Sequence, residues 1–323
     1  MMKNFAYVKA GSLAEAIRSL STQGAWLHAG GIDLLGCARN EILPVEKIVS
    51  ISRLKQLNGI AAQPDGGVKI GALTSLAQIA ANAQITAKYS ALAQAAAAVG
   101  TPQIREQGTI GGNLCQRPRC WYFRSDLRCL KKGGTNCYAA TGENQYHAVF
   151  GGGPCFFVHP SDAAVALVAL QAQLSIAGKT GSKSVKIESF FVSPKTAVTK
   201  ENVLLPGEIV TEIRLPAAGG TLKSLFRKIA ARGSWDFALA SVAVALQIES
   251  DGVRAARIVL GGVGPYPWRA EAAEKLLVGR KLDSTVAAAS AEAAVTGGMA
   301  LKGNAYKLDM IKGAVEESLG ALI

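Results

Sequence analysis

The chain has 323 residues, of which 49% are hydrophobic and 18% charged, and its formal net charge at pH 7 is +12. This length can hold two domains with a sizeable core, and this composition excludes an intrinsically disordered chain. Lysine and arginine are spread along the sequence outside one cysteine-rich loop, without a helix-turn-helix, RNP or zinc-finger pattern. We therefore expect no nucleic-acid partner. The positive charge favours either a basic protein without a charge-specific partner or docking on acidic partner subunits.

The sequence also bears on membranes and on compartment. No window approaches the ~18 consecutive apolar residues of a membrane-spanning helix, and the first twenty residues lack the apolar run and cleavage site of a signal peptide. We expect a cytoplasmic chain with no transmembrane segment, or a periplasmic one if a partner that bears a signal exports the folded complex. In a reducing compartment, clustered cysteines more often bind metal or do redox work than form disulfides.

The first predicted elements form a βαβ-like unit. It consists of a strand at 5–10, a helix at 12–21, a strand, glycine turn and helix start at 25–35, and a strand at 46–52. Ser12 precedes the helix and Glu15 follows three residues later. This spacing predicts a capping box, in which each side chain accepts a hydrogen bond from the other residue's backbone N–H.

A second group of elements follows. Its predicted helices are 75–85 and 89–100, and Ser161 and Asp162 begin a further apolar helix that leads into a strand within 161–178. Its predicted strands are 66–73, 147–153, 155–160, 184–192 and 208–216. Pro216 and the glycine pair Gly219–Gly220 then interrupt the pattern and indicate a boundary.

The third group places strands before helices. The strands are predicted at 221–230, 237–250 and 253–270, the middle one long enough to leave a partly helical alternative. The helices are predicted at 270–279, 283–297 and 304–322. This order is typical of an α+β domain with helices packed on one face of a sheet.

Two glycine pairs are candidate anion sites, Gly30–Gly31 and Gly111–Gly112. A glycine pair lets a ligand approach the backbone closely, and N–H groups that converge there favour an anion such as a diphosphate. Neither pair belongs to a G-x-G-x-x-G or Walker motif, so a standard Rossmann or P-loop site is not supported. A plain tight turn remains the alternative for each pair taken alone.

Five stretches in order, "AWLHAGGIDLL", "IGALTSLAQIA", "GTIGGNL", "HPSDAAVALVAL" and "ARIVLGGVGPYPWRAEAAE", resemble the flavin-binding subunit of the molybdenum hydroxylases. This is the family of xanthine dehydrogenase, aldehyde oxidoreductase and carbon monoxide dehydrogenase. The resemblance covers nearly the whole chain. It implies an α+β fold with a PCMH/VAO-type FAD-binding region at 1–218, divided into subdomains 1–57 and 58–218, and a C-terminal α+β domain at 219–323.

The resemblance also implies an FAD site. Its diphosphate cradle would consist of two loops: Leu27, His28, Ala29, Gly30, Gly31, Ile32 and Asp33, and Thr109, Ile110, Gly111, Gly112 and Asn113. Asp162 matches an acidic residue that contacts FAD, and Lys228 matches a lysine near the isoalloxazine. Taken alone, Asp162 could cap its helix and Lys228 could be a solvated surface lysine. Ile32 stands where the family has Thr or Ser, so backbone N–H groups would carry the phosphate contact there.

Four of the six cysteines, Cys115, Cys120, Cys129 and Cys137, lie in one short loop, and Cys155 follows it. No C-x2-C pair occurs, which argues against a zinc ribbon and against a ferredoxin-type run. Cations crowd the loop, and they would offset the negative charge of a metal–thiolate cluster: Arg117, Arg119, Arg124, Arg128, Lys131 and Lys132. The aromatic run 121–123 could shield such a cluster from water. The residues alone indicate only some metal or redox site. An iron–sulfur cluster, a different metal and disulfides all remain open.

Most flavin subunits of the family lack this insertion, at 114–156 here. A minority carry an extra [4Fe–4S] cluster in it, as the periplasmic aldehyde oxidoreductase of enteric bacteria and 4-hydroxybenzoyl-CoA reductase do. On that pattern the implied iron ligands are Cys120, Cys129, Cys137 and Cys155. Cys115 would then be a bystander, and we interpret Cys37 as a buried helix residue.

No set of residues for substrate chemistry is recognisable, because none of the three histidines stands with a serine or cysteine in a convincing base arrangement. This favours an electron-transfer subunit. The resemblance implies a large partner subunit with the molybdenum cofactor, a small partner with [2Fe–2S] clusters, and an unknown external acceptor. A free-standing flavoenzyme of the same fold and a zinc-binding scaffold protein are the alternatives.

Overall fold

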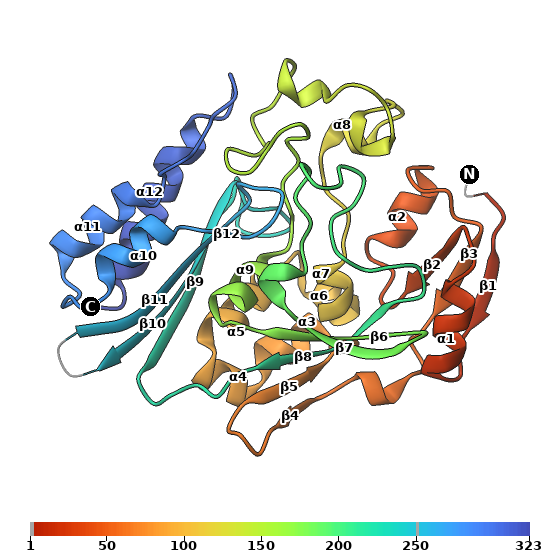
Figure 1. Ribbon diagram of the computed structural model, residues 1–323, viewed down its shortest axis with the longest axis horizontal. Coiled ribbons are helices and arrows are strands. Elements are labelled where there is room, and N and C mark those ends of the chain that lie inside the picture. The colour runs from red at the N-terminus through yellow and green to blue at the C-terminus, as the bar shows by residue number, and fades with distance from the viewer. Residues whose placement is uncertain (1–2, 250–251) are drawn as a thin grey trace.

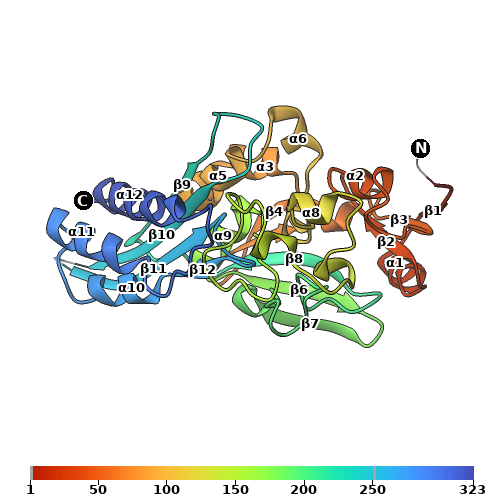
Figure 2. The same cartoon turned by 90° about the horizontal axis from the view of Figure 1, so that it is seen from above.

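The computed structural model describes residues 3–249 and 252–323 and has an α+β fold, as the sequence predicts. Three sheets follow one another along the described chain, with strand orders β1-β3-β2, β4-β5-β8-β6-β7 and β12-β11-β10-β9. The first and last sheets lie at opposite ends of the molecule, and the five-stranded sheet lies between them (Figures 1 and 2). No helix in these two described ranges is long and apolar enough to cross a membrane.

The first sheet is the predicted βαβ-like unit. Its elements are β1 (Ala6–Lys9), α1 (Leu13–Leu20), β2 (Ala25–His28), α2 (Leu34–Arg39) and β3 (Lys47–Ser50). β3 is the central strand and runs parallel to both neighbours. Half of the capping box forms: the Ser12 hydroxyl accepts from the Glu15 N–H at 3.2 Å, whereas the Glu15 carboxylate accepts from the Gly11 N–H at 2.8 Å.

The second sheet is antiparallel and is covered by short helices. Its strands are β4 (Ile60–Ala62), β5 (Val68–Gly71), β6 (Gln173–Gly178), β7 (Gly181–Lys186) and β8 (Ile209–Leu215). The helices of this segment are α3 (Leu76–Ala81), α4 (Ala83–Lys88), α5 (Ser90–Ala97), α6 (Pro102–Gln107), α7 (Ile110–Leu114), α8 (Trp121–Arg124) in the cysteine loop and α9 (Asp162–Ala169). All eight residues of α9 are buried, and five of the eight in α5 are, because small alanine side chains let these helices approach closely.

The predicted strands at 147–153 and 155–160 are wrong. Both segments are irregular, and their apolar side chains, such as Phe150 and Phe157, are buried without a strand ladder. Gly151 and Gly153 adopt positive φ angles of 58° and 78°, which break an extended run. The backbone N–H of Phe150 instead donates to the carbonyl of Val263 at 3.0 Å. The predicted strand at 184–192 ends early, because β7 gives way to a 3-10 turn at Ile187–Ser189.

The third sheet consists of β9 (Leu222–Ile229), β10 (Ala240–Glu249), β11 (Gly252–Gly261) and β12 (Trp268–Arg269), all antiparallel. The predicted helices form α10 (Glu271–Leu277), α11 (Ser284–Ala293) and α12 (Tyr306–Gly320). The partly helical alternative for the middle strand is wrong over its described part; Ser250, the last residue of that prediction, lies outside the described residues.

Both faces of the third sheet are covered, which the sequence did not predict. Along β10, Val242 and Val244 face the core under α10, α11 and α12, whereas Ala243 and Ala245 face the core shared with α5 and α9. A strand buried on both faces reads as a continuous apolar run rather than an alternating one. An apolar run of this kind is also compatible with a buried helix, which accounts for the partly helical alternative.

Candidate functional site

A cavity of about 1020 Å³ is lined by residues of the first sheet, the helices of the second segment and the loop that follows β9. Twelve of the fourteen predicted FAD-site residues line it: Leu27, Ala29, Gly30, Gly31, Ile32, Asp33, Thr109, Gly111, Gly112, Asn113, Asp162 and Lys228. The other two lie outside the lining. Ile110 is fully buried in the core, and the His28 ring packs edge-on against Tyr7. Cavities of this size suit a ligand as large as a dinucleotide.

The first glycine turn connects β2 to α2 and packs directly against the segment that precedes the second turn. A Cβ atom at Gly30 would lie 1.7 Å from the carbonyl oxygen of Gln107, so only glycine fits there. Gly31 has a φ of +76°, which favours glycine for conformational reasons. Within the described residues, the backbone N–H groups of Gly30, Gly31 and Ile32 donate to no protein acceptor. They are therefore available to an anion in the cavity.

The second glycine turn begins α7 and is satisfied internally. The Gly111 N–H donates to the carbonyl of Ala72 at 2.9 Å, and the Gly112 N–H donates to the Thr109 hydroxyl at 3.2 Å. The side-chain oxygen of Asn113 accepts from the Ser161 hydroxyl at 2.5 Å, which ties α7 to α9. This turn forms a rigid wall of the cavity, while the free N–H donors belong to the first turn.

Asp162 and Lys228 form a buried ion pair on the cavity wall, with 2.7 Å between the lysine Nζ and Oδ2. Lys228 also donates to the carbonyls of Ala98 and Asp236 at 3.1 and 2.8 Å. Burial raises the pKa of the Asp162 carboxyl, and the Lys228 ammonium opposes part of that rise.

The two simpler roles considered for this pair are wrong. Ser161, and not Asp162, caps α9, because its hydroxyl accepts from the Ala164 N–H at 2.9 Å. The Lys228 side chain is 11% exposed, so it is no solvated surface lysine.

Four cysteines surround a second, much smaller cavity of about 10 Å³: Cys120, Cys129, Cys137 and Cys155. Its remaining lining is largely aromatic and apolar and includes Tyr122, Phe123 and Phe157. All six cysteines of the chain are free thiols. Cys115 instead lines the large cavity, and Cys37 is fully buried on α2, as expected.

The donor set of the small cavity suits an iron–sulfur cluster. The cavity has room for about one water molecule, so the four thiols would have to move apart around a cluster. Among the described residues, no three or more His, Cys, Asp or Glu side chains converge closely enough to hold a single metal ion. A [4Fe–4S] cluster needs less convergence, because each of its thiolates binds a different iron.

Comparison with known proteins now identifies the family. Residues 3–218 match the family described as FAD binding domain in molybdopterin dehydrogenase, and residues 224–307 match the CO dehydrogenase flavoprotein C-terminal domain. The chain belongs to the FAD-binding subunits of the molybdenum hydroxylases. This flavoprotein subunit therefore binds FAD and is part of an oxidoreductase.

Its relatives agree in length and fold. The aldehyde oxidoreductase FAD-binding subunit PaoB of Escherichia coli K12 is 37% identical, over 85% of this chain and 86% of its own. The glyceraldehyde dehydrogenase medium chain of Sulfolobus acidocaldarius is 31% identical, over 86% and 83%. The carbon monoxide dehydrogenase structure from Hydrogenophaga pseudoflava superposes with a TM-score of 0.79 at 27% identity, over 99% and 98%.

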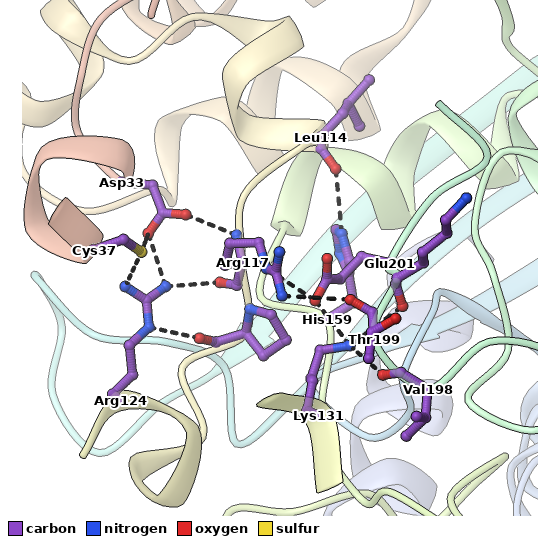
Figure 3. A network of polar contacts seen from close by, with 12 residues as sticks. Asp33, Cys37, Leu114, Arg117, Arg124, Lys131, His159, Val198, Thr199 and Glu201 are labelled. Atoms are coloured by element: carbon purple, nitrogen blue, oxygen red, sulfur yellow. Dashed lines mark hydrogen bonds and ion pairs between the residues drawn. The ribbon is translucent and has the colours of Figure 1, made fainter. Parts of the chain in front are cut away.

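Two carboxylates fasten the cysteine loop of the flavoprotein subunit to the large cavity (Figure 3). Asp33 accepts from the Arg117 backbone N–H at 2.7 Å and pairs with Arg119 and Arg124 at 3.0 and 2.8 Å. Glu201 pairs with the side chains of Arg117 and Lys131 at 3.1 and 2.8 Å. The sequence suggested six cations that would offset the charge of a cluster. Four of them instead pair with these carboxylates and hold the loop in place.

Sequence reasoning missed two residues of the flavoprotein subunit. Glu201 carries both of its ion pairs while 5% exposed, and nothing in its neighbourhood along the chain signals this role. The ring of His147 lies on the wall of the small cavity, with Nε2 3.2 Å from the Cys120 sulfur. The position of His147 in the sequence, between Cys137 and Cys155, is the signal for this role.

Proposed function

We propose that this chain is the electron-transfer subunit of a molybdenum hydroxylase that oxidises an aldehyde, and that it holds a [4Fe–4S] cluster in addition to FAD. In this proposal a large partner subunit carries the molybdenum cofactor and oxidises the substrate, and a small partner carries [2Fe–2S] clusters. This chain receives electrons from the small partner and delivers them to an external acceptor. The aldehyde substrate is supported by two relatives, an aldehyde oxidoreductase and a glyceraldehyde dehydrogenase.

The residues of the large cavity would hold and tune the flavin. The free N–H groups of Gly30, Gly31 and Ile32 supply hydrogen-bond donors for the FAD diphosphate without a side-chain hydroxyl. Lys228 supplies a positive charge on the cavity wall and is held in place by Asp162. This charge favours a reduced, more negative flavin nearby. When bound, FAD exchanges single electrons with iron–sulfur clusters and pairs of electrons with an acceptor.

The observation that carries the cluster proposal is the convergence of Cys120, Cys129, Cys137 and Cys155 on one cavity. These residues are up to 35 positions apart in the sequence, so the fold, and not local spacing, brings them together. The aromatic lining limits access of water, which is one of the factors that set the potential of a cluster. Free thiols at all six positions also argue against a disulfide loop.

The test is anaerobic purification of the complex from its native host, with analysis of chains, flavin, iron and molybdenum. We expect this chain to co-elute with a larger molybdenum-containing chain and a small iron–sulfur chain, with one FAD per copy and more iron than [2Fe–2S] clusters explain. A chain that elutes alone with flavin would be a free-standing flavoenzyme instead. Zinc in place of the extra iron would contradict the cluster.

A further inference from the structure

His147 lies in direct contact with one of the four cavity cysteines. His147 is 3% exposed, and its Nε2 atom is 3.2 Å from the sulfur of Cys120. The other two histidines are placed differently: the His28 ring packs on Tyr7, and Nε2 of His159 lies 3.3 Å from the carbonyl of Leu114. His147 is thus the histidine whose ring reaches the cysteine cavity.

The surroundings of the ring assign its proton. The Nδ1 atom of His147 is buried and has no hydrogen-bond partner among the described residues. A proton on Nδ1 would be a buried donor without an acceptor, which costs more than the lone pair of a bare nitrogen. A ring with a single proton therefore carries it on Nε2, 3.2 Å from the Cys120 sulfur, which is an acceptor when Cys120 is a thiolate.

Several segments hold the ring in this orientation. The His147 backbone N–H donates to the carbonyl of Asn144 at 2.9 Å, and its own carbonyl accepts from the Asn304 side chain at 3.1 Å. The rings of Trp121 and Tyr122 flank the imidazole, each with its centroid 5.9 Å away. Asn304 comes from the segment before α12, so the C-terminal domain helps to position a residue of the cysteine loop.

We propose that His147 donates a hydrogen bond from Nε2 to the Cys120 sulfur and thereby raises the reduction potential of the [4Fe–4S] cluster. This inference rests on the proposed cluster. A donor proton carries partial positive charge, and it stabilises the reduced cluster, which is more negative, more than the oxidised one. Hydrogen bonds to the sulfurs are among the factors that set the potentials of such clusters. His147 is a positioning residue in this role and does not bind iron itself.

The test compares two substitutions in the complex purified from its native host. His147→Phe keeps a flat ring but removes the donor, whereas His147→Gln retains an N–H group that reaches a similar position. His159→Phe is the matched control, because it removes a buried imidazole that does not line the cysteine cavity. The readouts are iron content and the midpoint potential of the [4Fe–4S] signal in an EPR-monitored redox titration.

We expect His147→Phe to keep its iron and show a lower midpoint potential, while His147→Gln and His159→Phe stay close to the native value. Native potential in an iron-loaded His147→Phe complex, or equal shifts in the Phe and Gln variants, would overturn the inference. If His147→Phe loses its iron, the Gln variant decides: native potential supports the hydrogen bond, and lost iron or a lowered potential overturns it. A native complex without this cluster would instead refute the proposed function.

Discussion

The Asp162–Lys228 pair shows how single residues shape the FAD cavity. Both side chains are almost fully buried, and their opposite charges compensate each other on the cavity wall. A buried pair of this kind gives little net stability over an apolar pair, but the loss of one partner leaves the other charge uncompensated.

Lys228→Met therefore leaves the buried Asp162 carboxylate without its cationic partner. We expect it to lower the free energy of unfolding by about 3–5 kcal/mol and to reduce the FAD content of the purified protein. The double variant Asp162→Asn/Lys228→Met should recover part of that loss, because no charge is left buried. Chemical denaturation and flavin absorbance measure both quantities. Additive losses in the double variant would show that the two side chains do not act as a pair.

Gly30 provides a sharper test of the first glycine turn. In Gly30→Ala the new Cβ would collide with the carbonyl oxygen of Gln107, and the turn that carries the free N–H donors must shift. We expect loss of FAD with little loss of secondary structure. Gly36→Ala is the matched control, because a Cβ there meets nothing within 4 Å. Full FAD content in Gly30→Ala, measured by absorbance after gel filtration, would show that this turn does not hold the nucleotide.

The cysteine loop is fixed to the FAD region by two carboxylates rather than by a sheet or a long helix. Asp33 comes from the start of α2 and Glu201 from the segment between β7 and β8, so distant parts of the chain hold one loop. Asp33 accepts hydrogen bonds from the Arg117 N–H and from Arg124, and hydrogen bonds to charged groups contribute about 1.5–3 kcal/mol each. The loop therefore depends on a few strong contacts.

Asp33→Asn should loosen the loop. It weakens the contacts to Arg119 and Arg124, and we expect amide hydrogen exchange over 117–132 to accelerate at least about tenfold, since that factor corresponds to about 1.4 kcal/mol. Glu41→Gln is the control, because its ion pair with Lys3 is exposed and contributes little. Unchanged exchange in Asp33→Asn would show that the loop is held by packing alone.

The sequence predicted elements well wherever the signal was local. Ser161 before an apolar run predicted the start of α9, and the glycine pairs predicted the turns that line the large cavity. The strand at 147–153 failed, because Val149 and Phe150 are buried in the core with β11 and the C-terminal helices and form no ladder. The strand at 155–160 failed, because Cys155 and Phe157 are buried around the small cysteine cavity. Glu201 could not be predicted at all, since its role exists only where tertiary structure brings Arg117 and Lys131 to it.

The whole molecule places the FAD cavity and the four-cysteine cavity side by side in one chain. The large cavity takes residues from the N-terminal sheet, the central helices and the loop after β9, while the cysteine loop borders it through Arg117, Arg119, Asp33 and Glu201. The family resemblance gave the order of these parts, and the structure adds that the carboxylates on the cavity wall also hold the cysteine loop. A change at either site can therefore reach the other through shared side chains.

The proposed [4Fe–4S] cluster requires that Cys120, Cys129, Cys137 and Cys155 bind iron and that Cys115 does not. The most direct measurement is the iron and flavin content per chain of Cys155→Ser and Cys115→Ser complexes purified without oxygen. We expect Cys155→Ser to lose the iron of one [4Fe–4S] cluster and keep FAD, and Cys115→Ser to keep both. Full iron in Cys155→Ser, or loss of that iron in Cys115→Ser, would contradict it.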